Sequence, residues 1–536
     1  MSNAGASFLD KLIAEKKAPC EFDAEGKQRT QADLLIEIGR GHVLFHDKAG
    51  DAFAEVGKAV CLISSSQYRE VLTEEYLSIT DRGCNRNALS DAIGTLSSIA
   101  KYRGDQKDVW LRVGGTLDRV MIDTGDADYS IIEVTAEGWR LADSHRPMFR
   151  RFPNMLPLPV PASPDFSRIW NYLNVSEETR PLIAGFLLSV FSPAGPYPPL
   201  VPSGEQGTGK STFTKLLKKL ADPSTSPLRA PPKEVRDLLV GAINCRLLAI
   251  DNISSINPQL SDAFCRIATG GAISERALYS NTDEVLVEVQ RPMIINGIED
   301  PATRPDLAER AIHIELEQID TRRTEAEFWS SFEKDAPHIF GALLEGLVCS
   351  VKNHNTIEIG KLPRMADFAK WAAAGMAPLG FTADQFVSAY RANIQDGQTS
   401  SVDSSPVGEA IVKLMAFNIQ WSGTASDLLT ALTRIADDAM TRNPGWPKNA
   451  RWMTGAVTRI SPALRAKGIS VERKRTEDAR LILLCNVPKI ASCSSAASFA
   501  ARPDGNDGND GNDAKADLCR ACDGEGCYHC EPEVRI

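Results

Sequence analysis

The chain lacks a long apolar run. Its longest apolar stretch, residues 181–191, has 11 residues, whereas a helix that spans a bilayer needs about 20. The N-terminus also lacks the charged segment followed by an apolar segment that marks a secretory signal. We therefore expect no membrane partner and a cytoplasmic location.

The chain also lacks an excess of positive charge and a secreted type of cysteine pattern. Its net charge is −10, so any binding to nucleic acid must depend on local basic patches. Eight of its 12 cysteines are scattered through the body of the chain and four lie in the last eighteen residues. That distribution does not resemble a disulfide framework and indicates a reducing compartment.

A length of 536 residues predicts several domains. Alternating strand-like and helix-like pieces in the centre predict a parallel sheet, so the expected class is multidomain α/β. The expected segments are a mixed α+β accessory domain (1–152), a Pro-rich linker (153–164), a parallel-sheet core (165–317), a helical region (318–395), a basic domain (405–487), a flexible linker (488–517) and a cysteine knuckle (518–532). No catalytic constellation stands out in the first of these.

A glycine-rich stretch, "LVPSGEQGTGKST" at 200–212, carries the most specific motif. It contains G-x-x-x-x-G-K-S between a strand-like and a helix-like segment, the context of a phosphate-binding loop. Glycines allow backbone N–H groups to point at phosphate oxygens, Lys210 reaches the β- and γ-phosphates, and the Ser211 hydroxyl completes a Mg²⁺ shell. The predicted ATP-binding residues are Gly204, Glu205, Gln206, Gly207, Thr208, Gly209, Lys210, Ser211 and Thr212. A Gly-rich turn with a chance Lys-Ser pair is the alternative.

A second hydrophobic run ends at Asp251, which we expect to hold Mg²⁺ with Ser211; a helix-capping Asp is the alternative. The next residue is Asn252, where many ATPases place a catalytic glutamate. Because Asn cannot take a proton at neutral pH, hydrolysis is expected to be slow or to use a neighbouring carboxylate. Glu275 and Glu205 are candidates by nearness in sequence.

Two further polar residues complete the predicted catalytic set. Asn296 ends the strand-like "RPMIING", and beside the Asp251 strand it could hydrogen-bond the γ-phosphate or the attacking water. Arg310, in "DLAERAIHIEL", precedes a further strand, from which it could reach the nucleotide of an adjacent subunit. The alternative for Arg310 is a surface salt bridge.

These segments, with a hairpin predicted from "RALYS" and "VLVEVQ" around a polar turn, resemble the AAA+ branch that carries a hairpin before its Asn strand. That branch includes superfamily-three helicases and ATP-binding helicase-like proteins of prophages and integrative elements. The resemblance spans about 165–395 and implies a ring-shaped hexamer that hydrolyses ATP between subunits and moves on single-stranded DNA. It also implies DNA contact from the hairpin. The expected turn is acidic at Asp283 and Glu284, so Arg276 or backbone amides are the candidate contacts.

A basic module follows. Residues 441–480 hold ten Lys and Arg against three acids, with "KNARWMTGAVTRISPALRAKG" predicted as a helix pair or one interrupted helix before a two-stranded wing. This pattern resembles a winged-helix domain, which suits duplex DNA phosphates. The candidate DNA contacts there are Arg451, Arg459, Arg465, Lys474 and Arg475. A protein-docking domain is the alternative.

The chain closes with "CRACDGEGCYHC", in which Cys519, Cys522, Cys527 and Cys530 form C-x2-C-x4-C-x2-C. Four thiolates at this spacing suit tetrahedral Zn²⁺, and His529 could replace one of them. Free thiols or a redox pair are the alternatives.

The sequence therefore predicts an ATP-driven DNA helicase or translocase of a mobile element, with ATP, Mg²⁺ and Zn²⁺ as cofactors. The rivals are an AAA+ initiator or loader that does not unwind DNA, and an ATP-dependent protein-interaction or defence component.

Overall fold

A computed structural model describes residues 29–486 apart from 143–147, 255, 277–283, 298–303, 320–321, 404, 444 and 476–479. It gives only the backbone at 274–276, 284–287, 305, 400–401, 403 and 439. The predicted linker 488–517, the cysteine knuckle and the first 28 residues lie outside this description. Among the described residues, no helix has the length and apolarity to cross a membrane.

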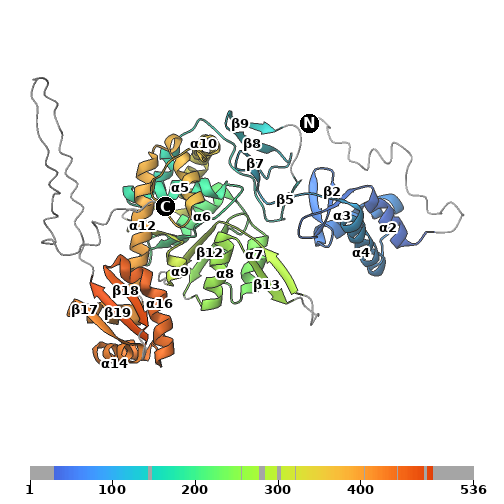
Figure 1. The fold of residues 1–536 in the computed structure, drawn as a ribbon. Coiled ribbons are helices and arrows are strands. Elements are labelled where there is room, and N and C mark those ends of the chain that lie inside the picture. The colour runs from blue at the N-terminus through green and yellow to red at the C-terminus, as the bar shows by residue number, and fades with distance from the viewer. Residues whose placement is uncertain are drawn as a thin grey trace, which may run out of the picture. The chain divides into compact units, whose positions relative to one another are not determined.

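The first described elements build a small α+β unit (Figure 1). They are α2 (Gln31–Arg40), β1 (Val43–His46), β2 (Ala52–Val56), β3 (Ala59–Leu62), α3 (Ser66–Thr80), α4 (Arg86–Arg103) and β4 (Asp105–Gln106). The sheet order is β3-β2-β1-β4. Helix α2 begins where Thr30 and Asp33 form a capping box. The helices bury Leu35, Tyr68 and Leu96 in a separate core.

The next elements form an antiparallel sheet in the order β6-β7-β8-β9 and a short parallel pair, β10-β5. Their bounds are β5 (Val109–Trp110), β6 (Val113–Thr116), β7 (Arg119–Asp123), β8 (Ile131–Thr135), β9 (Gly138–Ala142) and β10 (Met148–Phe149). Val120, Ile122 and Ile132 belong to the same buried cluster as the apolar run at 181–191. This part of the predicted accessory domain therefore shares its core with the segment that follows, because its apolar alternation needs a partner surface.

The central segment contains a parallel sheet in the order β12-β15-β11-β16. Its elements are η1 (Phe166–Asn171), η2 (Glu177–Thr179), α5 (Arg180–Val190), β11 (Leu200–Ser203), α6 (Lys210–Ala221), α7 (Val235–Ile243), β12 (Leu248–Ile253), α8 (Pro258–Thr269), β15 (Met293–Gly297), α9 (Pro305–Ala308) and β16 (Ile312–Glu315). Near-continuous apolar strands are typical of a sheet covered on both faces. The predicted multidomain α/β class is confirmed.

The hairpin before β15 differs from the prediction. Its strands are β13 (Ala272–Arg276) and β14 (Glu284–Glu288), which pair antiparallel with Arg276 opposite Glu284. The first strand therefore ends where "RALYS" was expected to begin, and Glu284 belongs to a strand instead of the turn. Alternating "AISER" satisfies the strand period as well as "RALYS" does, so the pattern could not choose between them. Asp283 lies outside the described residues.

Three long helical elements follow: α10 (Glu325–Asn353), α11 (Ala366–Ala374) and α12 (Ala383–Asp403), with η3 (Ala377–Leu379) between the last two. Helix α12 runs through most of the polar stretch 395–406 that was expected to be a break. The prediction of a break there is wrong because Val402, which is fully buried, anchors the last turn. Polar residues on the remaining faces do not prevent a helix.

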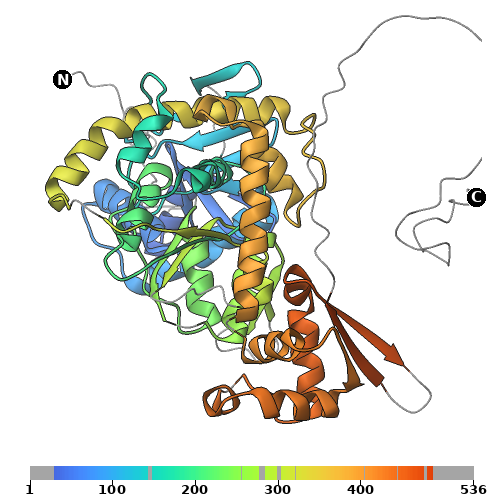
Figure 2. The same cartoon turned by 90° about the vertical axis from the view of Figure 1, so that its left-hand side faces the viewer.

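The C-terminal elements have their own core (Figure 2). They are α13 (Pro406–Ala416), β17 (Gln420–Thr424), α14 (Ala425–Ile435), α15 (Asp438–Arg442), α16 (Ala450–Ala466), β18 (Ile469–Arg475) and β19 (Arg480–Asn486). The sheet order is β17-β19-β18 and every pairing in it is antiparallel. Of the two alternatives for the basic segment, one helix is found, α16, with Pro462 inside it.

Candidate functional site

The glycine-rich loop joins β11 to α6 at the middle of the parallel sheet. Its glycines take positive φ angles of 140° at Gly204, 90° at Gly207 and 83° at Gly209. Other residues rarely adopt these conformations, so the motif glycines are required by the backbone. Gly209 caps α6, whose first turn begins at Lys210. The loop thus ends at a helix N-terminus, where backbone N–H groups favour an anion.

The side chains of the loop are arranged around this opening. Lys210 Nζ donates to the carbonyl oxygens of Gly204 (2.7 Å) and Glu205 (2.9 Å). Thr208 is buried and its hydroxyl donates to Glu205 O (3.0 Å). Gln206 and Thr212 are exposed. The ammonium group of Lys210 therefore lies over the loop, on hydrogen bonds that can be exchanged for phosphate oxygens.

Ser211 and Asp251 come together although 40 residues separate them. The Ser211 hydroxyl lies 2.9 Å from Asp251 Oδ1 and 3.1 Å from Oδ2. Helix α6 carries the serine and β12 carries the aspartate, so strand and helix fix the pair. A hydroxyl beside a carboxylate is the oxygen donor set that a hard cation such as Mg²⁺ prefers. These two residues fit the predicted metal role.

Asn252 occupies a bulge in β12. Its φ is +63°, and the register of β12 against β15 shifts between Ile250 and Ile253. The left-handed region is unfavourable for most side chains, but Asn tolerates it. The side chain of Asn252 is exposed. Backbone geometry therefore gives a physical reason for Asn at a position where a longer carboxylate side chain was expected.

Asn296 connects β12, β15 and α6. Its Oδ1 accepts the backbone N–H of Asn252 (2.8 Å), and its Nδ2 donates to Thr214 Oγ1 (3.1 Å). The side chain is only 2% exposed. Both ends of the carboxamide are engaged within the protein, so contact with a phosphate or a water requires one of these bonds to be exchanged.

A segment after β16 packs against the glycine-rich loop. The sequence pattern did not reveal this contact. Asn174 Nδ2 donates to Thr208 O (2.9 Å) and also bonds Glu317 O. Gln318 Nε2 donates to Glu205 Oε2 (2.8 Å). The predicted base candidate Glu205 is therefore paired with an amide from this segment.

Arg322 belongs to the same segment. Its Nη2 lies 3.5 Å from the place that a Cβ on Gly207 would occupy, so its guanidinium group is beside the loop. Neither Arg322 nor Asn174 stands in a motif, and only the tertiary contacts show their relation to the loop.

Arg310 lies between α9 and β16. Its Nη1 donates to Asp306 O, and within the described part of the chain its buried Nε has no hydrogen-bond partner. Arg310 forms no salt bridge with a described carboxylate, so the alternative of a surface ion pair finds no support there.

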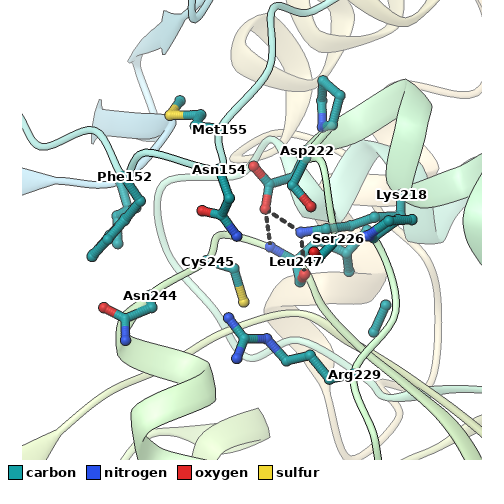
Figure 3. A pocket seen from close by; sticks show the side chains of 15 residues that line it. Phe152, Asn154, Met155, Lys218, Asp222, Ser226, Arg229, Asn244, Cys245 and Leu247 are labelled. Atoms are coloured by element: carbon teal, nitrogen blue, oxygen red, sulfur yellow. Dashed lines mark hydrogen bonds and ion pairs between the residues drawn. The ribbon is translucent and has the colours of Figure 1, made fainter.

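The far end of α6 is held by buried charges (Figure 3). Lys218 Nζ donates to Asp222 Oδ2 (2.6 Å) and Leu247 O (2.7 Å). Asp222 also accepts Arg112 Nε (3.2 Å) and the backbone N–H of Leu247 (3.0 Å). Burial alone would raise the pKa of Asp222, but Lys218 and Arg112 outweigh it and hold that pKa well below its usual value. This cluster ties the end of α6 to Leu247, directly before β12, and to Arg112, directly before β6.

The predicted DNA contacts lie mainly on α16 and β18. The side chains of Arg451, Arg459, Arg465, Lys474 and Arg475 are exposed. For Arg276 and Glu275 the structure describes the β13 backbone alone, and Cys519, Cys522, Cys527, Cys530 and His529 lie outside the described residues.

The fold and this site define a multidomain α/β protein in which a glycine-rich loop, a lysine and a Ser-Asp pair meet at the carboxyl ends of the strands of a parallel sheet. Residues 166–400 match the family described as actinomycete integrative conjugative element replication protein, and residues 407–497 match the AICE RepA C-terminal domain. The chain is thus similar, over both its central and its C-terminal parts, to replication proteins of integrative conjugative elements. No curated protein matches it.

Solved structures that can be superposed on the chain include two of the NrS-1 C-terminal region. An A form apo structure of the NrS-1 C-terminal region is 11% identical, with a TM-score of 0.36, and covers 85% of this chain and 98% of its own. An apo structure of the same region, residues 305–718, is 12% identical, with a TM-score of 0.35, and covers 86% and 100%. TM-scores of this size do not define a shared fold.

Proposed function

We propose that the chain is an ATP-dependent DNA helicase or translocase that serves the replication of an integrative conjugative element. The family match supports the role in replication. The observation that carries the ATPase assignment is the Ser211–Asp251 pair at 2.9 Å beside the glycine-rich loop. The AAA+ assignment is part of this proposal, and so is a location in the cytoplasm.

The residues of the site divide the work of phosphoryl transfer. The loop N–H groups and the end of α6 bind the phosphates, and Lys210 exchanges its loop carbonyls for β- and γ-phosphate oxygens. Ser211 and Asp251 would hold Mg²⁺, which when bound neutralises charge on the phosphate oxygens. Asn252 and Asn296 orient water through amide groups. Because such transfer depends mainly on positioning and charge stabilisation, hydrolysis proceeds without a glutamate at 252.

Arg310 is proposed to act on the nucleotide of an adjacent subunit. Arg310 as a whole is only partly buried and forms no salt bridge with a described carboxylate, which supports a contact between its guanidinium group and another chain. An arginine supplied by a neighbour neutralises charge in the transition state. Hydrolysis between subunits requires a ring oligomer, for which we propose a hexamer with single-stranded DNA in its centre.

The C-terminal part is proposed to be a winged-helix DNA-binding domain. Its order is α13-β17-α14-α15-α16-β18-β19, so a helix directly precedes the two strands that we propose as the wing. The exposed arginines of α16 suit DNA phosphates. Structural Zn²⁺ at the four C-terminal cysteines remains part of the proposal.

Mixing two inactive variants tests the site and its assembly together. Lys210→Ala removes phosphate binding, and Arg310→Ala removes the arginine supplied to a neighbour. Each variant alone should show less than a tenth of wild-type DNA-stimulated phosphate release. A mixture should recover part of that activity, because some interfaces pair an intact loop with an intact arginine.

A mixture that stays inactive, in a preparation that forms mixed oligomers, contradicts the action of Arg310 in trans. Wild-type protein that releases no more phosphate than Lys210→Ala contradicts the ATPase itself. Strand displacement on a forked duplex then separates the helicase from a loader, since a loader hydrolyses ATP without releasing the strand.

A further inference from the structure

A groove of about 360 Å³ lies along α16, in the C-terminal domain formed by α13 to β19. It is lined by Gly445, Pro447, Arg451, Trp452, Gly455, Ala456 and Arg459. Trp452, at the edge of this groove, is 55% exposed, whereas Met453 and Val457 of the same helix are fully buried in the domain core. The core face of α16 therefore does not account for the tryptophan, which is a large apolar surface left in solvent.

Gly455 explains why the surface is hollow at this point. It lies one turn after Trp452 and one turn before Arg459, on the same side of the helix. A glycine inside a helix costs about 1 kcal/mol relative to alanine. A Cβ at this position would lie 3.5 Å from Arg459 Nη1. The missing side chain leaves an open space between the indole ring and the guanidinium group.

The charges around the groove are all of one sign. Arg451 and Arg459 are exposed and form no ion pair with the part of the chain that the structure describes. No Asp or Glu occurs between Ala450 and Gly468. The groove thus combines an aromatic face, room beside it and two arginines, which is the combination that binds a base together with its phosphates.

We propose that this groove binds an unpaired base of a nucleic-acid strand, stacked on Trp452, while Arg451 and Arg459 bind the flanking phosphates. The proposal rests on the DNA-binding role proposed above for this domain and specifies the form of its ligand. A base within a duplex is already stacked on both faces, so an exposed indole ring has little to gain from it. An unpaired base offers a free face, and every base can provide one.

The test compares two strands that differ only in their bases. The probes are a fluorescently labelled oligo-dT and an oligomer of equal length in which every base is replaced by an abasic analogue. Both carry the same phosphates, so the difference in affinity reports what the bases contribute, and Trp452→Ala shows how much of it is stacking on the indole ring. The full-length protein is used without nucleotide, and binding is followed by fluorescence anisotropy at one fixed salt concentration.

Wild-type protein should bind oligo-dT more tightly than the abasic strand. Trp452→Ala should weaken oligo-dT binding about tenfold and leave abasic binding unchanged, and Trp452→Phe should recover part of the loss. Arg451→Ala together with Arg459→Ala should weaken binding to both strands. Phe417→Ala is the matched control, because Phe417 is 89% exposed in the same domain but outside the groove; it should bind as wild type does.

The proposal is overturned if Trp452→Ala binds oligo-dT as tightly as wild type, or if it weakens binding to a blunt duplex by the same factor. Failure of the proposed helicase function is seen separately, in phosphate release and strand displacement. Loss of stacking with normal phosphate release contradicts neither the ATPase nor its loop.

Discussion

The two ends of α6 are built in opposite ways. At its N-terminal end, Lys210 donates to two loop carbonyls and Ser211 donates to one carboxylate near the surface. At its C-terminal end, Lys218 and Asp222 are buried, and Arg112, from the segment before β6, reaches Asp222. One end keeps its polar groups available, and the other uses them to fix the helix.

The difference separates binding from positioning. Bonds between exposed polar groups contribute little to stability and are easily exchanged for those of a ligand. A buried charge that loses its partner is costly, so the cluster at the other end does not open. The loop can therefore change partners while the axis of α6 stays fixed relative to β12, which carries Asp251.

Asp222→Asn, at the C-terminal end of α6, should have the largest effect on stability. The variant leaves Lys218 buried without its carboxylate partner and Arg112 with only the charge of Asp123 beside it, and breaking a buried pair in this way costs about 3–5 kcal/mol. Thermal unfolding should show a clear fall in the midpoint of the transition that includes the central segment. Asp251→Asn is the matched change at the other end, and it should unfold within about 1 kcal/mol of wild type while losing phosphate release. Equal destabilisation by both variants would show that the two ends do not differ.

Acid should destabilise the folded protein through the carboxylate of Asp222. The pKa of Asp222 in the folded protein is held below its usual value, so its contribution to stability is present above about pH 4 and decreases as the pH falls below that value. Asn at 222 should remove this part of the acid dependence. Unfolding followed by tryptophan fluorescence between about pH 2 and pH 6 measures it, and identical acid profiles for both proteins would contradict the assignment.

The motif end of α6 could be predicted from sequence and the buried end could not. Glycines, Lys210 and Ser211 stand at fixed offsets because the chemistry of phosphate binding sets both residue type and spacing. Asp251 follows from the apolar strand before it. Arg112 and Asp222 are 110 residues apart, and nothing in a local pattern reports a contact between the segment before β6 and the end of α6. The hairpin before β15 is found as predicted, but the limits of its first strand were not, since two overlapping stretches satisfied the strand period equally well.

Arg322 tests whether the N-terminal end of α6 and its loop bind phosphates. Its guanidinium group lies beside Gly207, so it should contact the phosphates that the loop binds. Arg322→Ala should weaken the binding of a fluorescent ADP analogue about tenfold, the effect of losing one charged hydrogen bond of about 1.4 kcal/mol.

Arg323→Ala is the matched control for this measurement. Arg323 interacts electrostatically with Glu327 and Tyr172, and its removal should leave nucleotide affinity within a factor of two. Equal losses in the two variants would indicate a general effect of charge and would remove Arg322 from the site.

Asn252 gives the smallest effect and the most direct test of why a glutamate is missing. Because its φ is +63°, Asn252→Gly should be neutral or slightly stabilising, whereas Asn252→Glu should cost about 1 kcal/mol. The added carboxylate should not raise phosphate release, since the bulge in β12 sets where the side chain points. Single-turnover hydrolysis and thermal unfolding of both variants measure this. Faster hydrolysis by Asn252→Glu with unchanged stability would show that the site accepts a carboxylate base, and that the backbone does not explain its absence.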